Sequence, residues 1–569
     1  MTPEAERRAQ KNVRWTPAPD SGILPDMNNL VPASKGLLRP RVPSLETNLA
    51  LLAGLVAATG LPPYPWTGLL LPLGLGLFFG LLARAENPGR LAWFFGLAHQ
   101  TVVLHWLFLL IPAKTIPTRA LVPVQAVLAI LYVSVFYLVL GWVFGHLRRR
   151  LGPVRSFMLL PILWAGLEVL RAGGEMGFPW CLSGSCVIGT PLLFLAKTAG
   201  ELGLGVGMAF LAATLAAFRL RRGSVGDWGL PYVALVVATV VLWIGLVGGS
   251  FMRPQTVIRE GDFKPVAELR AGVVQANVDL QDKWVDARID STRIPYQELT
   301  AQAADAGAEF IVWAETAIPA YLRYDKPLLN WTRSVVRKSG AFLYAGFPDA
   351  ERMPDGGLRK YNSSGLFAPG GELLNRYPKH HLLPIGEAMP FSKYLPFLAK
   401  LDVGQAEWSP GEAPMPQRME LQDGTFDFSG LICFESAFAR LARQSVRAGS
   451  QCLVVLTNDG WFGRTAGPRQ HAALAQMRAA ECGVPVIRCA NNGISFLADD
   501  RGRILTELDL GRRGFVVGDL RPGTGSTMFV KWGNWPLLIF LMIWAGLVMN
   551  FKNGRESVEP SCPSREVVG

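Results

Sequence analysis

The sequence lacks the cysteine patterns of zinc proteins and is poor in charge. Its cysteines form no CxxC pair and no Cys/His spacing typical of a zinc site, which argues against a structural metal. They are Cys181, Cys186, Cys433, Cys452, Cys482, Cys489 and Cys562. Charged residues make up only 18% of the chain, whereas hydrophobic residues make up 50%. A chain of 569 residues with this composition is too long and too apolar to be one soluble domain.

The apolar residues gather in long runs, several of which reach the roughly 20 residues that a helix needs to cross a bilayer. These runs predict eight membrane spans, at 45–60, 66–83, 91–111, 119–145, 154–170, 191–217, 230–250 and 530–549. The first and fifth runs are short or contain polar residues, so seven spans are an alternative. Lys197 and Glu201 stand four residues apart within the sixth run, and we expect them to pair.

Lysine and arginine are placed asymmetrically around the predicted spans. The chain carries 56 basic and 44 acidic residues, and its basic loops alternate with poorly charged ones. The basic loops hold Arg84, Arg90, Arg148, Arg149, Arg150, Arg155, Arg219, Arg221 and Arg222, on the same side as the basic N-terminal tail. Because cytoplasmic loops are enriched in these residues, the positive charge indicates topology, and no nucleic-acid partner is expected.

Composition divides the chain into five parts. We expect a disordered basic cytoplasmic tail at 1–44, which lacks the apolar core of a removable signal peptide. The remaining parts are a transmembrane domain of seven helices at 45–250, a soluble domain at 257–525, a last transmembrane helix at 530–550 and a cytoplasmic tail at 551–569. With seven spans before it, the soluble domain lies opposite the tail, on the periplasmic side of a bacterial inner membrane. Cys181 and Cys186 share a loop on that oxidising side and could pair.

The soluble domain alternates short apolar runs with polar helical stretches. The predicted strands are 269–276, 309–314, 341–346, 363–368, 427–433, 452–457, 485–490 and 493–498. The predicted helices are 292–306, 327–339, 436–448 and 467–482, the last of which begins at Gly467-Pro468 and ends at Gly483. This alternation is typical of an α/β fold.

Three short motifs in this domain each carry one reactive residue. Glu315 follows an apolar strand, so partial burial should raise its pKa toward that of a useful base. Lys379 lies in a Pro- and Gly-rich loop and can act as a fixed cation. Cys433 stands between a strand and a helix, where a helix N-terminus is expected to lower the thiol pKa. A base, a cation and a thiol suffice for nucleophilic attack on a carbonyl without metal or cofactor.

The strings WAETAIP, YPKHHLLPIGE, CFE and NDGWFG, surrounded by membrane spans, resemble the apolipoprotein N-acyltransferase family. That family is a membrane-embedded branch of the nitrilase (carbon–nitrogen hydrolase) superfamily, so the resemblance implies a four-layer αββα sandwich. It also implies catalytic roles for Glu315, Lys379 and Cys433 as base, oxyanion-stabilising cation and nucleophile. The supporting or substrate-binding positions that it implies are Trp180, Trp284, Asn362, Glu387, Phe434 and Glu435. Phe434 departs from the tyrosine usual in the family and offers no phenol hydroxyl at this position.

The resemblance implies transfer of an acyl chain from a membrane phospholipid, through a Cys433 thioester, to the α-amino group of diacylglyceryl-modified apolipoproteins. The protein is expected to need no cofactor and to act as a monomer. A membrane-tethered amidase that hydrolyses a small amide would use the same three residues and is the first alternative. The second alternative is a transporter or scaffold whose nitrilase-like domain is degenerate.

Overall fold

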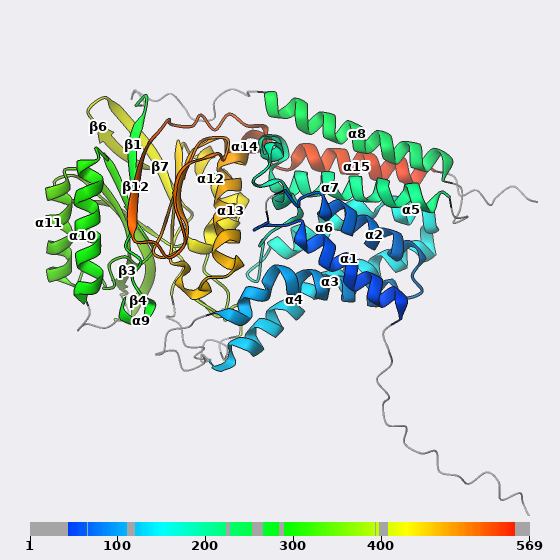
Figure 1. Cartoon of the computed structure of the whole chain (residues 1–569), viewed down its shortest axis with the longest axis horizontal. Helices are drawn as coiled ribbons and strands as arrows, with labels where there is room; N and C mark the ends of the chain where they lie inside the picture. The colour runs from blue at the N-terminus through cyan, green and yellow to red at the C-terminus, as the bar shows by residue number, and fades with distance from the viewer. Residues whose placement is uncertain are drawn as a thin grey trace, which may run out of the picture. The chain divides into compact units, whose positions relative to one another are not determined.

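A bundle of apolar helices and an α/β sandwich make up the described part of the chain (Figure 1). The computed structural model describes residues 44–64, 66–110, 120–222, 228–252, 266–283, 289–354, 356–392, 394–395, 397 and 408–551. The predicted tails 1–44 and 551–569 lie almost wholly outside these residues. Leu45 and all the described residues after it belong to one compact unit.

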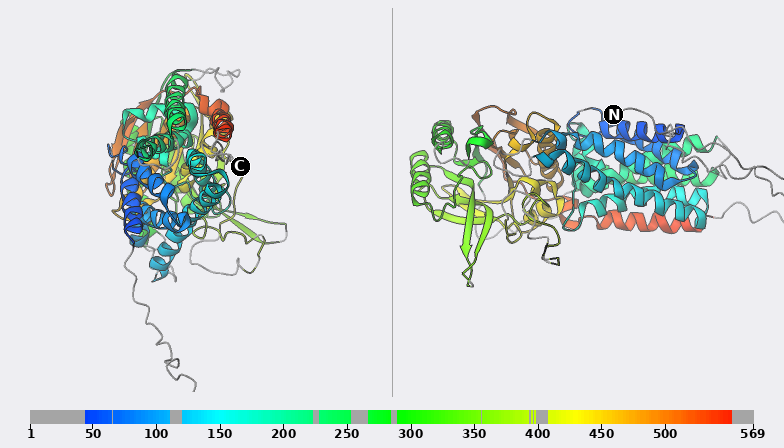
Figure 2. Two further views of the ribbon diagram at one scale, coloured as in Figure 1. Left: turned by 90° about the vertical axis from the view of Figure 1, so that its right-hand side faces the viewer. Right: turned by 90° about the horizontal axis from the view of Figure 1, so that it is seen from below.

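The helices of the bundle precede the sandwich in the sequence, except for α15, which follows it. Both views in Figure 2 show the helices of the bundle packed side by side. Its elements are α1 (Leu45–Thr59), α2 (Leu70–Arg84), α3 (Pro88–Leu104), η2 (His105–Leu109), α4 (Val122–Leu151), α5 (Pro153–Met158), α6 (Leu160–Ala172), η4 (Ser183–Val187), η5 (Pro191–Leu195), α7 (Ala196–Leu220), α8 (Gly229–Phe251) and α15 (Trp535–Asn550). Within the described residues, four helical stretches are long and apolar enough to cross a membrane: Pro88–Leu109, Val122–Leu151, Pro191–Leu220 and Gly229–Phe251. The helices α1, α2 and α15 are shorter and apolar.

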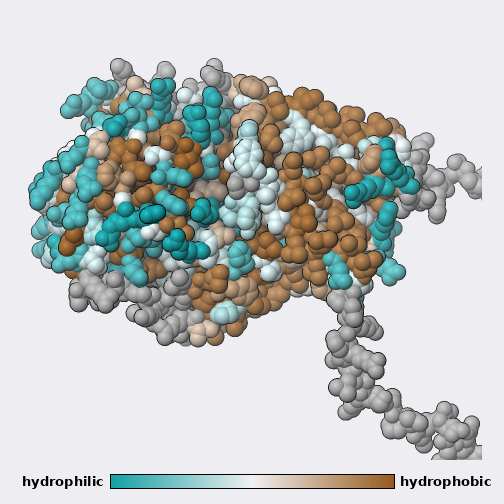
Figure 3. All heavy atoms as spheres, viewed as in Figure 1, coloured by the Kyte–Doolittle hydropathy of each residue, from teal (hydrophilic) through white to brown (hydrophobic). Residues whose placement is uncertain are grey.

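Each predicted span overlaps a helix, but the fifth is divided into α5 and α6, which meet at Leu159. Hydrophobic side chains predominate on the face of the bundle seen in Figure 3, as expected where lipid is the solvent. Hydrophilic side chains gather instead over the sandwich, on the side of α10 (Ile289–Asp305) and α11 (Lys326–Ser339).

Two six-stranded sheets form the sandwich. The first has the order β12-β1-β2-β3-β4-β5 and the second β11-β10-β9-β8-β7-β6. The strands are β1 (Leu269–Gln275), β2 (Phe310–Trp313), β3 (Phe342–Arg352), β4 (Leu358–Phe367), β5 (Leu373–Pro378), β6 (Gln417–Leu421), β7 (Gly424–Ile432), β8 (Cys452–Thr457), β9 (Val486–Ala490), β10 (Ser495–Ala498), β11 (Ile504–Leu508) and β12 (Gly514–Leu520). The centre of each sheet is parallel, with β1, β2 and β3 in one and β7, β8 and β9 in the other.

The sheets pack face to face through buried apolar residues of both, among them Phe310 and Tyr344 against Phe428. Helices α10 and α11 cover the outer face of the first sheet. Helices α12 (Ala439–Arg447) and α13 (Ala466–Cys482) cover the second. The result is the four-layer αββα arrangement. Short elements complete it: α9 (Leu280–Lys283), η8 (Cys433–Ala437), η9 (Asp459–Phe462) and α14 (Met528–Trp532).

Helix α13 contacts both the second sheet and the membrane helices. It begins at Ala466 after an N-cap at Thr465, one residue before the predicted start, and it ends at Gly483 in the left-handed conformation, as predicted. Its buried Arg478 binds Glu201 of α7 with an N–O distance of 2.6 Å. The expected Lys197–Glu201 pair is therefore wrong, since the Lys197 ammonium lies 3.8 Å from Asp500. A kink at Ala199 and Gly200 separates the two positions, so the i,i+4 spacing of a regular helix does not hold there.

Candidate active site

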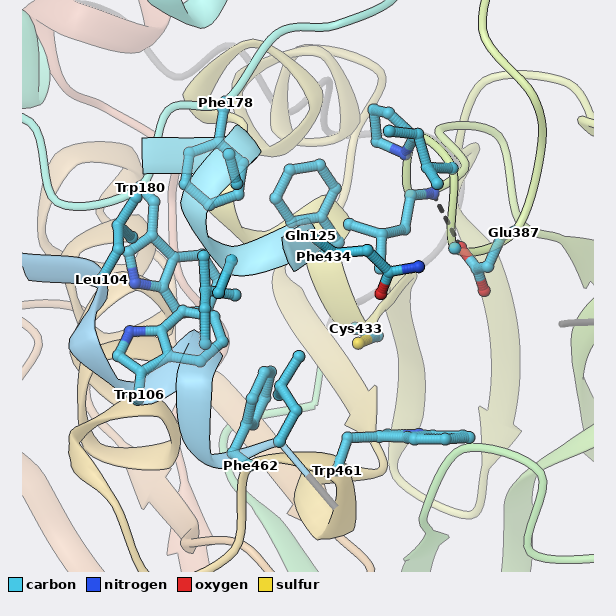
Figure 4. Close-up of a pocket in the computed structure, with 18 of the residues that line it drawn as sticks. Leu104, Trp106, Gln125, Phe178, Trp180, Glu387, Cys433, Phe434, Trp461 and Phe462 are labelled. Carbon is cyan, nitrogen blue, oxygen red and sulfur yellow. Dashed lines mark hydrogen bonds between the residues drawn. The ribbon is translucent and has the colours of Figure 1, made fainter. Parts of the chain in front are cut away.

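The sandwich and the membrane helices enclose a cavity of about 510 Å³ (Figure 4). Glu315, Lys379, Glu387 and Cys433 line it from the sandwich side. The opposite walls are mainly apolar and come from η2, α4 and the loop before η4; they include Trp106, Val122, Ala126, Ala129, Phe178 and Trp180. One wall is therefore reactive and the others suit a hydrocarbon chain.

The Glu315 carboxylate is buried and held by two donors. It follows strand β2, and Asn362 Nδ2 donates to its Oε1 at 2.8 Å. The backbone N–H of Asn458 donates to its Oε2 at 2.9 Å. Burial raises the pKa of Glu315, and the Glu387 carboxylate raises it further, although the Lys379 ammonium opposes them. The raised pKa expected from the sequence is thus confirmed.

Lys379 forms a buried ion pair with Glu387, with an N–O distance of 2.7 Å. Asn362 Nδ2 and the Leu383 N–H also donate to Glu387, which fixes the carboxylate against the loop that carries the lysine. Burial alone would lower the pKa of Lys379, but Glu387 and the neighbouring acidic groups raise it above its ordinary value. The residue therefore stays a cation, and Asn362, by donating to both carboxylates, links its partner Glu387 to Glu315.

Cys433 begins the one-turn 3-10 helix η8 directly after β7, with a left-handed backbone angle φ of 55°. Such a conformation persists in a non-glycine residue only where the surroundings enforce it. The expectation that a helix N-terminus lowers the thiol pKa is wrong. Burial raises the pKa of Cys433, and the Glu315 carboxylate adds to the rise, against the opposing charge of Lys379. The sulfur therefore rests as a thiol and needs a base before it can attack.

Glu435 connects the turn of Cys433 to the loop of Lys379. Its Oε2 accepts from the Ile432 N–H at 2.7 Å. Its Oε1 accepts from the Tyr377 hydroxyl and from the backbone N–H groups of His380 and His381, at 2.8, 2.8 and 2.9 Å. Four donors on one fully buried carboxylate hold the two loops together.

Phe434 and Trp180 form part of the apolar wall. The Phe434 ring stacks on Phe178 at a centroid distance of 5.8 Å and on Trp180 at 6.5 Å. Figure 4 shows Phe178 and Trp180 on the side of the cavity away from Glu387, with Phe434 between them and Glu387. In the same loop region, Cys181 and Cys186 are both free and buried, so no disulfide joins them.

The structure brings Glu315, Lys379, Cys433, Glu387, Phe434 and Trp180 to one cavity, with Asn362 and Glu435 behind it. Trp284, the remaining predicted site residue, lies outside the described residues. No cluster of three or more His, Cys, Asp or Glu side chains that could hold a metal ion occurs in the parts of the chain that are described.

Sequence reasoning missed several residues around the site. Asn458 and His471 line the cavity, and the string NDGWFG contains the first without revealing its contact to Glu315. Lys283 is buried and donates to the Glu315 carbonyl and to Thr316 Oγ1, at 3.1 and 2.7 Å. Burial lowers the pKa of Lys283 to about 7, although Glu315 opposes the shift. A lysine in a short polar stretch gives no sign of such a position.

The raised pKa of Glu315 predicts how reaction at Cys433 depends on pH. If the carboxylate must be ionised, the rate should fall about tenfold for each pH unit below that pKa. Asn362→Leu removes a hydrogen bond that lowers the pKa, so the acidic limb should move to higher pH. The pH profile of Cys433 acylation measures this, with the exposed Asn375→Leu as the matched control. An acidic limb that stays in place or moves to lower pH would contradict the prediction.

Comparison with known proteins covers both parts of the chain. Residues 53–214 match the apolipoprotein N-acyltransferase N-terminal domain, and residues 270–528 match the carbon-nitrogen hydrolase family. The apolipoprotein N-acyltransferase of Geobacter metallireducens is 33% identical over 506 residues, which cover 87% of this chain and 92% of that protein. The enzyme of the same name from Vibrio cholerae is 30% identical and covers 89% and 96%. Among solved structures, an amidase from Nesterenkonia sp. is 19% identical, with a TM-score of 0.35 over 49% of this chain and 99% of that one.

Proposed function

Because this chain belongs to the apolipoprotein N-acyltransferase family and is an N-acyltransferase, we propose that it uses a phospholipid as acyl donor and a Cys433 thioester as intermediate. The acceptor is then the α-amino group of the diacylglyceryl-modified cysteine that begins an apolipoprotein. The observation that carries the proposal is the cavity itself, in which Glu315, Lys379 and Cys433 face apolar walls built by membrane helices.

In the first half-reaction, Glu315 takes the thiol proton and the Cys433 sulfur attacks the ester carbonyl of the phospholipid. The Lys379 ammonium and the Phe434 backbone N–H stabilise the oxyanion that forms. The ester C–O bond then breaks, and the departing alkoxide receives the proton from Glu315. A lysophospholipid leaves and the acyl chain remains on Cys433 as a thioester.

In the second half-reaction, the α-amine of the acceptor attacks the thioester. An α-amine has an ordinary pKa near 8, so a substantial neutral fraction exists at physiological pH. Glu315 takes the proton that the amine loses and returns it to the departing Cys433 sulfur. The product is an amide, and the enzyme is restored by ping-pong kinetics.

The apolar walls explain why transfer is favoured over hydrolysis. They hold the acyl chain and keep water from the thioester until an amine arrives. Trp106 and Trp180 are both nearly fully buried, and α4 supplies small side chains such as Ala126 and Ala129 that leave room for a chain.

The distribution of arginine supports a periplasmic catalytic domain. Arg148, at the end of α4, donates to the carbonyls of Ala83 and Ala85 at the end of α2, so these two helix ends lie together. The catalytic cavity lies at the other end of α4, where Val122 and Ala126 line it. By the positive-inside rule the arginine end is cytoplasmic, and the cavity then opens at the outer face.

Obstructing the cavity should slow acylation of Cys433 by the lipid donor more than it slows alkylation of the Cys433 thiol by a small reagent. Ala129→Phe places a ring in the space for the acyl chain, so acylation of Cys433 by a long-chain phospholipid should fall about tenfold or more. Alkylation of Cys433 by iodoacetamide should stay within about threefold of the unaltered protein, since this small reagent does not need the same space. Val135→Phe, on an exposed part of the same helix, is the matched control. Equal loss in both assays, or no loss with phospholipid, would contradict the assignment of the cavity.

Labelled phospholipid tests the proposed reaction. Purified protein incubated with a phospholipid labelled in its acyl chain should retain the label until a diacylglyceryl-cysteine peptide is added, and the label should then move to the peptide. Prompt release of labelled free fatty acid without acceptor would favour a hydrolase and overturn the proposal.

A further inference from the structure

Gln470 of α13 is a buried amide whose hydrogen bonds all go to the membrane helices and their loops. Its Oε1 accepts from the indole N–H groups of Trp106 and Trp180, both at 2.8 Å. Its Nε2 donates to the carbonyls of Pro62 and Val103, at 3.0 and 3.1 Å. Two lone pairs and two N–H groups are the full capacity of an amide. One amide side chain of the sandwich therefore uses all its hydrogen-bonding groups on three segments of the helical part.

The next residue on α13, His471, faces the nucleophile instead. The ring is fully buried, and its Nδ1 lies 2.9 Å from Asp459 Oδ1. Its Nε2 lies 3.0 Å from the Cys433 carbonyl oxygen and 3.1 Å from Ser436 Oγ. Arg488 donates to the other Asp459 oxygen at 2.8 Å, so the carboxylate that orients the imidazole is itself fixed. This arrangement holds the ring against the backbone of Cys433.

The backbone conformation of Cys433 needs support from its surroundings. Its φ of 55° is a left-handed angle that a cysteine adopts only under constraint. The groups on its carbonyl oxygen are His471 Nε2 and the Ser436 hydroxyl, which donates at 2.9 Å. Since Ser436 belongs to the same short turn, His471 is the contact from α13 to the Cys433 carbonyl itself. Arg478 of the same helix donates to the Ala437 carbonyl at the end of the turn, at 3.1 Å.

We propose that Gln470 and His471 are positioning residues that hold the Cys433 nucleophile at a fixed position relative to the acyl cavity of the membrane helices. Trp106 and Trp180 line the cavity and fix α13 through Gln470, and α13 fixes Cys433 through His471. Trp180 also contacts the His471 ring directly, at a centroid distance of 5.4 Å. An acyl chain lodged against these indoles thus meets a sulfur whose place is set by the same helix. The inference rests on the proposed function in that it takes Cys433 as the group that is acylated.

Single-turnover acylation of Cys433 by labelled phospholipid tests the proposal, with the rate constant and the half-saturating phospholipid concentration measured separately. His471→Leu removes the contact to the Cys433 carbonyl, whereas His471→Gln presents an amide N–H group to the same oxygen. Gln470→Leu removes all four bonds to the helical part. Trp180→Phe removes one indole donor to Gln470 and changes the packing less than Gln470→Leu does. It tests the same contact if Gln470→Leu fails to fold.

The rate constant should fall about tenfold in His471→Leu and Gln470→Leu, with the half-saturating concentration unchanged, and about threefold in Trp180→Phe. His471→Gln should recover most of the loss. Because the two residues act along one path, the double variant Gln470→Leu/His471→Leu should be within about twofold of the slower single variant. A purely structural role predicts lower thermal stability and less active protein, but no such rescue or coupling.

Gln476→Leu is the matched control, since Gln476 lies on the same helix and its amide donates to the carbonyl of Gly502, a residue of the sandwich. Rates within twofold of the unaltered protein in the Gln470 and His471 variants would overturn the inference, as would multiplicative losses or a change confined to half-saturation. Those results would leave the proposed function standing if Cys433 is still acylated. Absence of label on Cys433 in the unaltered protein would instead overturn both.

Discussion

Replacing Cys433 by alanine should reduce acyl transfer by at least about 10,000-fold, because the covalent path depends on a single nucleophile. The sulfur lies in the cavity with Glu315 and Lys379, and its raised pKa makes the base indispensable. Transfer of labelled acyl chain to a diacylglyceryl-cysteine peptide measures the effect in purified protein.

Cys452→Ala is the control for this prediction. Cys452 is fully buried in β8 and is absent from the residues that line the cavity, so its replacement tests loss of a thiol without loss of the nucleophile. Transfer should stay within a few-fold of the unaltered protein. A Cys433→Ala protein that keeps more than about one percent of the activity would contradict a covalent mechanism.

Removing the buried ammonium should have the second largest effect. Lys379→Met keeps the length of the side chain but loses the charge that, in the proposed mechanism, faces the oxyanion, and loss of one such donor typically costs about 100- to 1,000-fold in rate. The effect should fall on the rate constant of acylation and leave the binding of phospholipid nearly unchanged, because the charge it stabilises exists only in the transition state.

The same substitution leaves the Glu387 carboxylate without its ion-pair partner in a buried site. A double variant that also carries Glu387→Gln should therefore regain stability against heat without regaining activity. Lys360→Met, at an exposed position on β4, is the matched control. A Lys379→Met protein with full activity, or one whose activity returns with Glu387→Gln, would contradict the role of the ammonium.

The distribution of apolar residues along the sequence was enough to predict much of the fold. The eight apolar runs correspond to helices because burial in lipid demands a length and a composition that few other structures need. The strands of the parallel centre, such as β8, were predictable because they are buried on both faces and are continuously apolar. The edge strands β5, β6, β11 and β12 were all missed, since most of their residues are exposed or only partly buried and each strand contains a charged residue.

The resemblance was enough to predict which residues meet at the cavity, but their surroundings were not predictable. The contact of Asn458 to Glu315 and that of His471 to Cys433 join residues more than 30 positions apart, so no local pattern reveals them. The prediction for the Cys433 thiol failed for a related reason. A turn position suggested a helix dipole, whereas burial and the charge of Glu315, which depend on the tertiary fold, determine the direction of the shift.

The most direct test of the covalent mechanism is a mass spectrum of the protein purified from membranes, followed by mapping of the modified peptide. The account predicts an added mass equal to one fatty acyl group, located on Cys433, labile to hydroxylamine and lost on incubation with an acceptor peptide. An unmodified Cys433 under conditions in which acyl transfer proceeds, or an acyl group on another residue, would contradict it.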